Sequence, residues 1–224
     1  MTSQDHVNRE FLNRELLNQG LGKLGLTEDQ HPGLAEKLIA YQTLVCEENE
    51  RFGLVRLHEE SDFVLKHVLD SLAPWRLLSG LPGAGRLVDL GSGAGLPGIP
   101  LALAFPQWQV TLAERKEKRV RFLELAIDRL KLTNVRLWPY QIEELKERFP
   151  VAVFRAFSPL DAPLLKVLKK LLTPQGFTVA YKGRREVLET EVTQVNRQLD
   201  QLQIVKLEVP FLDEERHVVV FQVR

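Results

Sequence analysis

Short apolar runs alternate with longer amphipathic stretches from residue 86 to the C-terminus, and few folds accommodate this alternation. The apolar runs predict strands over residues 86–90, 109–113, 135–138, 151–155 and 177–181. The stretches between them predict helices over residues 99–105, 117–131, 142–148 and 162–172. Strands and helices in this order form a mostly parallel α/β sheet covered on both faces, with a ligand site at the carboxyl ends of the strands.

The end of the chain departs from this alternation. A helix is predicted over residues 185–202, and two further apolar runs follow over residues 203–209 and 217–223, joined by a loop containing Pro210. Because this loop is too short for a crossover, we expect the two runs to pair as an antiparallel hairpin. A parallel five-stranded sheet with an added antiparallel pair resembles the class I, Rossmann-like fold of S-adenosylmethionine-dependent methyltransferases.

The first 80 residues have a different pattern. Their apolar residues recur three and four positions apart, which predicts three or so helices. Gly80, Pro82, Gly83 and Gly85 then form a turn-rich joint. We therefore expect a helical N-terminal region, residues 1–80, attached to an α/β domain, residues 81–224.

Composition excludes several classes of protein. The 224 residues are 44% hydrophobic, and one cysteine, Cys46, allows neither an internal disulfide nor a multi-cysteine zinc site. The five histidines show no metal-ligand spacing. No apolar run approaches the roughly 20 residues that span a bilayer, and the polar residues 1–10 do not resemble a secretory signal. We expect a cytoplasmic protein that binds no metal and no membrane.

Charge is balanced overall but segregated along the chain. Thirty basic and thirty acidic residues give no net charge, so composition alone does not indicate a nucleic-acid partner. Residues 115–136, however, contain eight basic and three acidic side chains, a balance of plus five. Such a run is either the solvated face of a helix or an edge that faces phosphates.

The glycine-rich segment 88–98, Val-Asp-Leu-Gly-Ser-Gly-Ala-Gly-Leu-Pro-Gly, lies between a predicted strand and a predicted helix. Glycines such as Gly91 and Gly93 permit positive φ and let the backbone approach a ligand closely. Glu114 ends the next strand, 23 residues after Gly91, where a carboxylate can accept both ribose hydroxyls of an adenosyl ligand.

Two cofactors fit this pattern. Glycines at positions 93, 95 and 98 satisfy the G-x-G-x-x-G of a nicotinamide site, which is a weak signal alone. Asp89, two residues before the first glycine, resembles the acidic residue of S-adenosylmethionine binders, where it helps to place the cationic methionine end. We favour S-adenosylmethionine over nicotinamide, and either over a tight turn that binds nothing.

The residues after the fourth and fifth strands restrict the methyl acceptor. Methylation of carbon 5 of a pyrimidine needs a cysteine nucleophile, but Cys46 lies in the helical region. Methylation of an exocyclic amine usually shows an Asn/Asp-Pro-Pro-aromatic sequence, whereas residues 155–159 read Arg-Ala-Phe-Ser-Pro. Guanine N7 has a free lone pair and no proton to lose, so its methylation needs no general base and positioning alone could suffice. We predict that Arg155 and Lys182, at successive strand ends, face the acceptor; Lys182 is equally explained as part of a solvated turn.

Four segments in this order and spacing resemble the bacterial small-subunit ribosomal RNA guanine-N7 methyltransferases, also called RsmG or glucose-inhibited division protein B. They are residues 67–71, 89–100, 155–157 and 180–183, and Gly-Leu-Pro-Gly-Ile-Pro at 95–100 is the most specific. The resemblance implies a cytoplasmic enzyme that uses S-adenosylmethionine to methylate N7 of one guanine in 16S rRNA or the 30S subunit, and we expect a monomer. Matching the family's motif residue by residue places its cofactor contacts on Gly91, Leu96, Ile142, Glu143 and Arg155.

Two departures from the family pattern and two other functions remain open. Gly53-Leu54-Val55 replaces the usual Asn-Leu-Thr, and Gln141 replaces an arginine. The chain could instead methylate another RNA or a small molecule, or it could be a noncatalytic RNA-binding assembly factor that retains the glycine loop.

Overall fold

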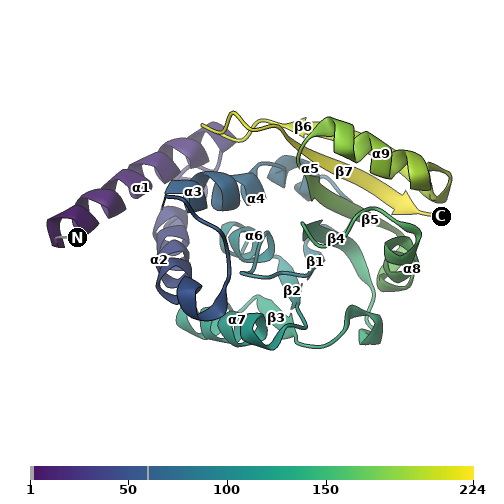
Figure 1. The fold of residues 1–224 in the computed structure, drawn as a ribbon, viewed down its shortest axis with the longest axis horizontal. Helices are drawn as coiled ribbons and strands as arrows, with labels where there is room; N and C mark the ends of the chain where they lie inside the picture. The colour runs from purple at the N-terminus through teal and green to yellow at the C-terminus, as the bar shows by residue number, and fades with distance from the viewer. Residues whose placement is uncertain (1–2, 60) are drawn as a thin grey trace.

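Within residues 3–59 and 61–224, which the structure describes, this computed structural model contains one seven-stranded sheet (Figure 1). The strand order is β3-β2-β1-β4-β5-β7-β6. Strands β1 to β5 are parallel to one another, and β7 is antiparallel to both β5 and β6. The strands are β1 Arg86–Leu90, β2 Gln109–Ala113, β3 Val135–Trp138, β4 Phe149–Arg155, β5 Leu172–Lys182, β6 Leu199–Leu207 and β7 Arg216–Val223. The predicted α/β architecture and closing hairpin are confirmed.

Helices cover both faces of the sheet because alternate strand residues point to opposite sides. Helices α6 (Gly98–Ala104) and α7 (Glu117–Arg129) share a hydrophobic core with one face, which includes Leu87 and Val110. Helices α8 (Ala162–Leu171) and α9 (Arg185–Val195) share a second core with the other face, which includes Val88 and Phe154. The apolar runs of the strands therefore reflect burial on both sides.

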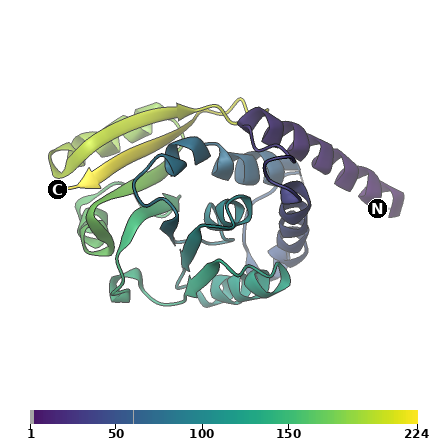
Figure 2. The same cartoon turned by 180° about the vertical axis from the view of Figure 1, so that it is seen from behind.

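The N-terminal region is helical, as predicted. Its elements are α1 Ser3–Leu24, α2 Leu34–Phe52, α3 Ser61–Phe63, the π-helix η1 Val64–Leu69, α4 Asp70–Leu72 and α5 Trp75–Ser79. Buried residues of this region, among them Leu38 and Phe63, belong to the same core as Leu87 and Val110 of the sheet. The far end of α1 extends beyond the rest of the chain in both views (Figures 1 and 2). None of the helices in the described residues is long and apolar enough to cross a lipid bilayer.

Two predicted helices differ from the structure. The helix predicted over residues 142–148 is wrong, because only a 3₁₀ turn, η2 Ile142–Glu144, forms there. Pro150 disfavours a helical conformation just before it, and Glu147 pairs with Arg86 and Arg136 at the start of β1 and in β3. The helix predicted over residues 185–202 ends at Val195, since pairing with β7 already begins at residue 199.

Candidate functional site

A cavity of about 590 Å³ opens at the carboxyl ends of β1 to β4. Its wall comes from the loops that follow these four strands and from the first turns of α7 and α8. Such a volume is typical of small-molecule sites, and the edge is the one predicted from the sequence. The lining residues are Gly91, Ala113, Glu114, Arg115, Lys116, Arg119, Tyr140, Gln141, Ile142, Glu143, Ala156, Phe157, Ser158, Asp161, Pro163, Leu164 and Val167.

The loop after β1 needs glycine at Gly91 and Gly93 for different reasons. Both have left-handed backbones, with φ of 67° and 60°. A Cβ on Gly91 would lie 2.3 Å from Cδ2 of Phe157, so the ring can lie against the loop only because the side chain is absent. A Cβ on Gly93 would meet no atom closer than 3.8 Å, so this position borders open space.

Glu114 fixes the loop at the edge of the cavity. Its carboxylate is 5% exposed, and its Oε2 accepts a hydrogen bond of 3.1 Å from the Gly93 N–H. Its Oε1 accepts hydrogen bonds of 2.9 Å from the N–H groups of Arg115 and Lys116. The Arg119 guanidinium lies 3.6 Å from Oε2. The predicted pair of glycine loop and carboxylate is therefore brought together, with acceptor capacity remaining at Oε2.

Asp89 lies beneath the glycine loop and does not line the cavity. It is fully buried, and its Oδ2 accepts a 3.0 Å hydrogen bond from the Gly98 N–H at the start of α6. Its Oδ1 has no hydrogen-bond partner among the described residues. Burial raises the pKa of Asp89 to about 7, with the hydrogen bond from Gly98 acting in the opposite sense. The structure thus gives Asp89 contacts to the loop that forms the cavity wall.

The pKa of Asp89 gives a test by pH. The pKa of Asp89 is about 7 in the fold and 3.8 in the unfolded chain, so its ionisation costs at most about 4 kcal/mol of stability. This cost is fully present above about pH 7 and absent below about pH 4. Asp89→Asn, which stays neutral and can still accept from Gly98, should therefore raise the melting temperature at about pH 8 and leave it unchanged at about pH 4. An equal gain at both pH values would contradict an ionisation cost.

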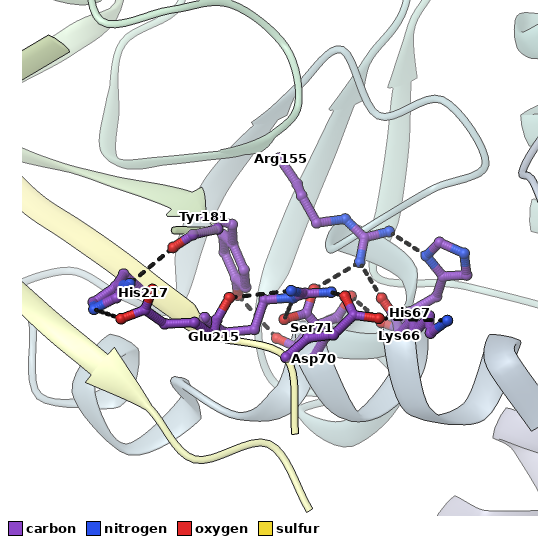
Figure 3. Close-up of polar contacts among 11 residues, drawn as sticks. Lys66, His67, Asp70, Ser71, Arg155, Tyr181, Glu215 and His217 are labelled. Carbon is purple, nitrogen blue, oxygen red and sulfur yellow. Dashed lines mark hydrogen bonds and ion pairs between the residues drawn. The ribbon is translucent and has the colours of Figure 1, made fainter. Parts of the chain in front are cut away.

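The side chain of Arg155, at the end of β4, points toward Lys66 and His67 of the N-terminal region (Figure 3), and it is not among the residues that line the cavity. Its Nη1 donates to the Lys66 carbonyl at 3.0 Å and to Asp70 Oδ2 at 2.9 Å, and its Nη2 lies 3.0 Å from His67 Nδ1. Because a guanidinium only donates, His67 Nδ1 is the acceptor. Burial and the Arg155 cation lower the pKa of His67 to about 3, so the imidazole is neutral at pH 7.

Asp70 is the buried anion of this network. Its carboxyl side chain is 4% exposed and also lies 3.4 Å from Nε of Arg216, at the start of β7. Burial raises the pKa of Asp70, while the Arg155 cation opposes that rise. Tyr181 of β5 donates to the neighbouring Ser71 carbonyl at 2.9 Å. The ends of three strands are thereby fastened to residues 66–71 of the helical region.

The model of the family described as rRNA small subunit methyltransferase G matches residues 34–219, and this match covers both the helical segment of the network and the cavity. The chain belongs to this family. The rRNA small subunit methyltransferase G of Treponema pallidum is 38% identical over 193 residues, which cover 84% of this chain and 85% of that protein. The protein of the same name from Brachyspira hyodysenteriae is 36% identical over 185 residues, covering 83% of this chain and 89% of the relative.

Solved structures confirm the class I methyltransferase fold. The tRNA (m1A58) methyltransferase TrmI from Aquifex aeolicus superposes with a TM-score of 0.55 at 15% identity, over 70% of this chain and 68% of that one. A methyltransferase from Pyrococcus furiosus gives 0.54 at 18% identity, over 84% and 98% of the two chains. The predicted fold and the predicted family of small-subunit rRNA methyltransferases are both confirmed.

The other predicted site residues of this member of the rRNA small subunit methyltransferase G family are divided between cavity and core. Ile142 and Glu143 line the cavity, whereas the Leu96 side chain is buried in the hydrophobic core. Lys182 is turned toward α9, where its Nζ donates to Glu191 Oε2 at 2.6 Å. Catalytic roles for Arg155 and Lys182 stay predictions, and each side chain is occupied by a protein partner.

One aromatic cavity residue and one network residue carried little signal in the sequence. Tyr140, 58% exposed, lines the cavity two residues after β3, and Phe157, 39% exposed, lines it two residues after β4. Reading every residue just after a parallel strand as a site candidate would have found Tyr140, whereas Phe157 lies in the segment 155–157 that the sequence had already singled out. Asp70 gave no signal of this kind, since its partners lie far away in the sequence.

Proposed function

We propose that this protein transfers a methyl group from S-adenosylmethionine to N7 of a guanine in 16S rRNA. The observation that carries the proposal is the Glu114 carboxylate, held by the glycine loop at the edge of a cavity, in a member of the rRNA small subunit methyltransferase G family. The named relatives are ribosomal RNA small subunit methyltransferases, and we extend their substrate class to this chain.

The cavity suits an adenosyl ligand. Glu114 can accept from ribose hydroxyls, and the apolar side chains of Ile142, Leu164 and Val167 offer a surface for a flat base. Open space beside Gly93 leaves room for a ligand close to the backbone. When bound, S-adenosylmethionine supplies an electrophilic methyl group on a sulfonium.

The wall of the cavity, as the described residues form it, lacks the cysteine that carbon-5 methylation of a pyrimidine requires. Among the residues that the structure describes, no histidine or cysteine lines it, and Cys46 lies on α2. Guanine N7 presents a lone pair and loses no proton, so the protein has only to align the base and exclude competing orientations. A pyrimidine C5 acceptor would require a nucleophile that this wall does not offer.

Basic side chains beside the cavity support an RNA substrate. Arg115, Lys116 and Arg119 line it, and Lys118 is exposed in the first turn of α7. Lys166, on α8, lines a smaller neighbouring cavity of about 260 Å³ that shares Ile142 with the first. Phosphate contacts on both sides would hold the RNA without reading its sequence. We place this activity on 16S rRNA or the 30S subunit in the cytoplasm, with the protein as a monomer.

The basic run gives a test by salt. Lys118→Ala should weaken binding to 16S rRNA and reduce the slope of log K against log salt by about one, the change expected from one lost phosphate contact. Arg119 is unsuitable for this test because it lies 3.6 Å from Glu114. Arg129→Ala, at the exposed far end of α7, is the control and should leave the slope unchanged. Equal slopes for Lys118→Ala and the unmodified protein would make Lys118 part of a solvated face.

The experiment that tests the function measures transfer from labelled S-adenosylmethionine to 30S subunits, deproteinised 16S rRNA and tRNA, all from cells that lack this protein. Label recovered as N7-methylguanosine from 16S rRNA is the expected result. Label in tRNA or in another base would overturn the proposed acceptor. Cofactor binding without any transfer to the three RNAs would favour the noncatalytic or small-molecule alternatives.

A further inference from the structure

The order of the strand ends indicates how a bound ligand is oriented in the cavity. Glu114 follows β2, with β3 on one side of it and β1 and then β4 on the other. The apolar part of the wall, which suits the adenine, consists of Ile142 after β3 with Leu164 and Val167 of α8. The sulfonium end of the ligand therefore lies toward Gly91 after β1 and Phe157 in the loop after β4. This step rests on the proposed function, because it assumes S-adenosylmethionine in the cavity.

Phe157 is the aromatic side chain at the β4 end of the cavity. Its ring is 39% exposed and lies over Gly91, where a Cβ would come within 2.3 Å of the ring. The ring of Phe154 is fully buried, and it contacts the Phe157 ring edge to face at a centroid distance of 6.1 Å. One part of the Phe157 ring is therefore supported by the protein, while the rest is free for another flat group.

The backbone at Ala156 separates the directions of the two neighbouring side chains. Ala156 has φ of 51°, in the left-handed region that residues with a Cβ rarely adopt and that recurs at functional sites. On one side of this turn, Arg155 points to Lys66, His67 and Asp70 (Figure 3). On the other side, Phe157 lines the cavity. The turn therefore presents an aromatic ring, and not the guanidinium, to the reacting end of the cavity.

We infer that Phe157 is the side chain on which the acceptor base stacks. RNA is read mostly through unstacked bases, and an aromatic ring offers a face to such a base. A purine on Phe157 would lie next to the sulfonium end of the cavity. The Asn/Asp-Pro-Pro-aromatic sequence is absent here, and Phe157, in the loop after the same strand, takes over the stacking contact.

The experiment compares Phe157→Ala, Phe157→Leu and Phe157→Tyr with the control Phe211→Ala. Phe211 is 40% exposed and lies between β6 and β7, outside the cavity wall. Three quantities are measured for each protein: the Kd for S-adenosylmethionine by calorimetry, the Kd for unmethylated 16S rRNA without cofactor, and kcat/KM for methyl transfer.

Phe157→Ala and Phe157→Leu should lower kcat/KM for RNA about 10-fold or more, the size expected for one lost base–aromatic stack. The Kd for S-adenosylmethionine should change less than about 3-fold, because the stack that is removed is made with the acceptor base and not with the cofactor. Phe157→Tyr keeps the ring and should restore the rate, and Phe211→Ala should match the unmodified protein. If Phe157→Leu has the same kcat/KM as Phe157→Tyr, the stacking role is overturned. A loss confined to the affinity for S-adenosylmethionine would overturn it as well.

The outcomes also separate this inference from the proposed function. If the unmodified protein places no label on 16S rRNA, the proposed function fails before any variant is compared. If the unmodified protein methylates 16S rRNA and Phe157→Ala does so at the same rate, only the role of Phe157 is wrong.

Discussion

Glu114→Gln should weaken the binding of S-adenosylmethionine about 10-fold or more, from the loss of one hydrogen bond between a ribose hydroxyl and a charged group, at about 1.5–3 kcal/mol. The carboxylate uses both oxygens within the protein: Oε2 for the Gly93 N–H, Oε1 for the N–H groups of Arg115 and Lys116. A glutamine has one oxygen, so its amide group would face at least one of these donors. The variant therefore either places its NH2 group at the Oε2 position and loses the ribose acceptor, or turns that group to the N–H groups of Arg115 and Lys116 and loosens the loop.

Glu117→Gln is the matched control for this prediction. Glu117 lies three residues away in the first turn of α7, is exposed, and pairs with Arg121. Its replacement should leave cofactor affinity unchanged in calorimetry. Melting temperatures of both variants show whether each is folded. Unchanged affinity in a folded Glu114→Gln protein would remove Glu114 from the ligand site and contradict the proposed position of the ribose.

Asp70→Ala should lower the free energy of unfolding by about 3–5 kcal/mol, the cost of removing one partner from a buried ion pair. Asp70 is 4% exposed and lies between Arg155 and Arg216, so its removal leaves two guanidinium groups close together without their shared anion. The measurement is urea denaturation at pH 7, with equal slopes required for a valid comparison.

Asp200→Ala provides the comparison for a surface pair. Asp200 pairs with Arg224 at 2.7 Å, and the two side chains are 49% and 58% exposed. Removal of this pair should cost less than about 1 kcal/mol, because solvent screens exposed charges. Similar losses from Asp70→Ala and Asp200→Ala would mean that the network at the end of β4 adds no stability beyond an ordinary surface contact.

The sequence was sufficient for the first three strands and the glycine loop. Strands β1, β2 and β3 begin and end where the apolar runs predict, because buried strands in a parallel sheet need apolar residues throughout. Glu114 and the glycine loop also meet as their spacing predicts, since both follow neighbouring parallel strands. These features depend on residues close in sequence or on a fixed sheet geometry.

The direction of long side chains could not be predicted in the same way. Arg155 and Lys182 do end successive strands, but Arg155 is drawn to Asp70, 85 positions earlier, and Lys182 to Glu191 on α9. A pattern of apolar residues gives no information on such distant partners. The failed helix over 142–148 has the same origin, because Glu147 is held by arginines at the start of β1 and in β3.

The shared core of the helical region and the sheet has a consequence for dissecting this enzyme. Leu38 and Phe63 are buried together with Leu87 and Val110, and Asp70 neutralises Arg155 across the same boundary. A fragment starting at residue 81 would present a bare apolar face and an unmatched cation to water, and such surfaces promote aggregation. The methyltransferase sheet is therefore not a module that can be transplanted alone, and a swap with a related enzyme has to carry its helices along.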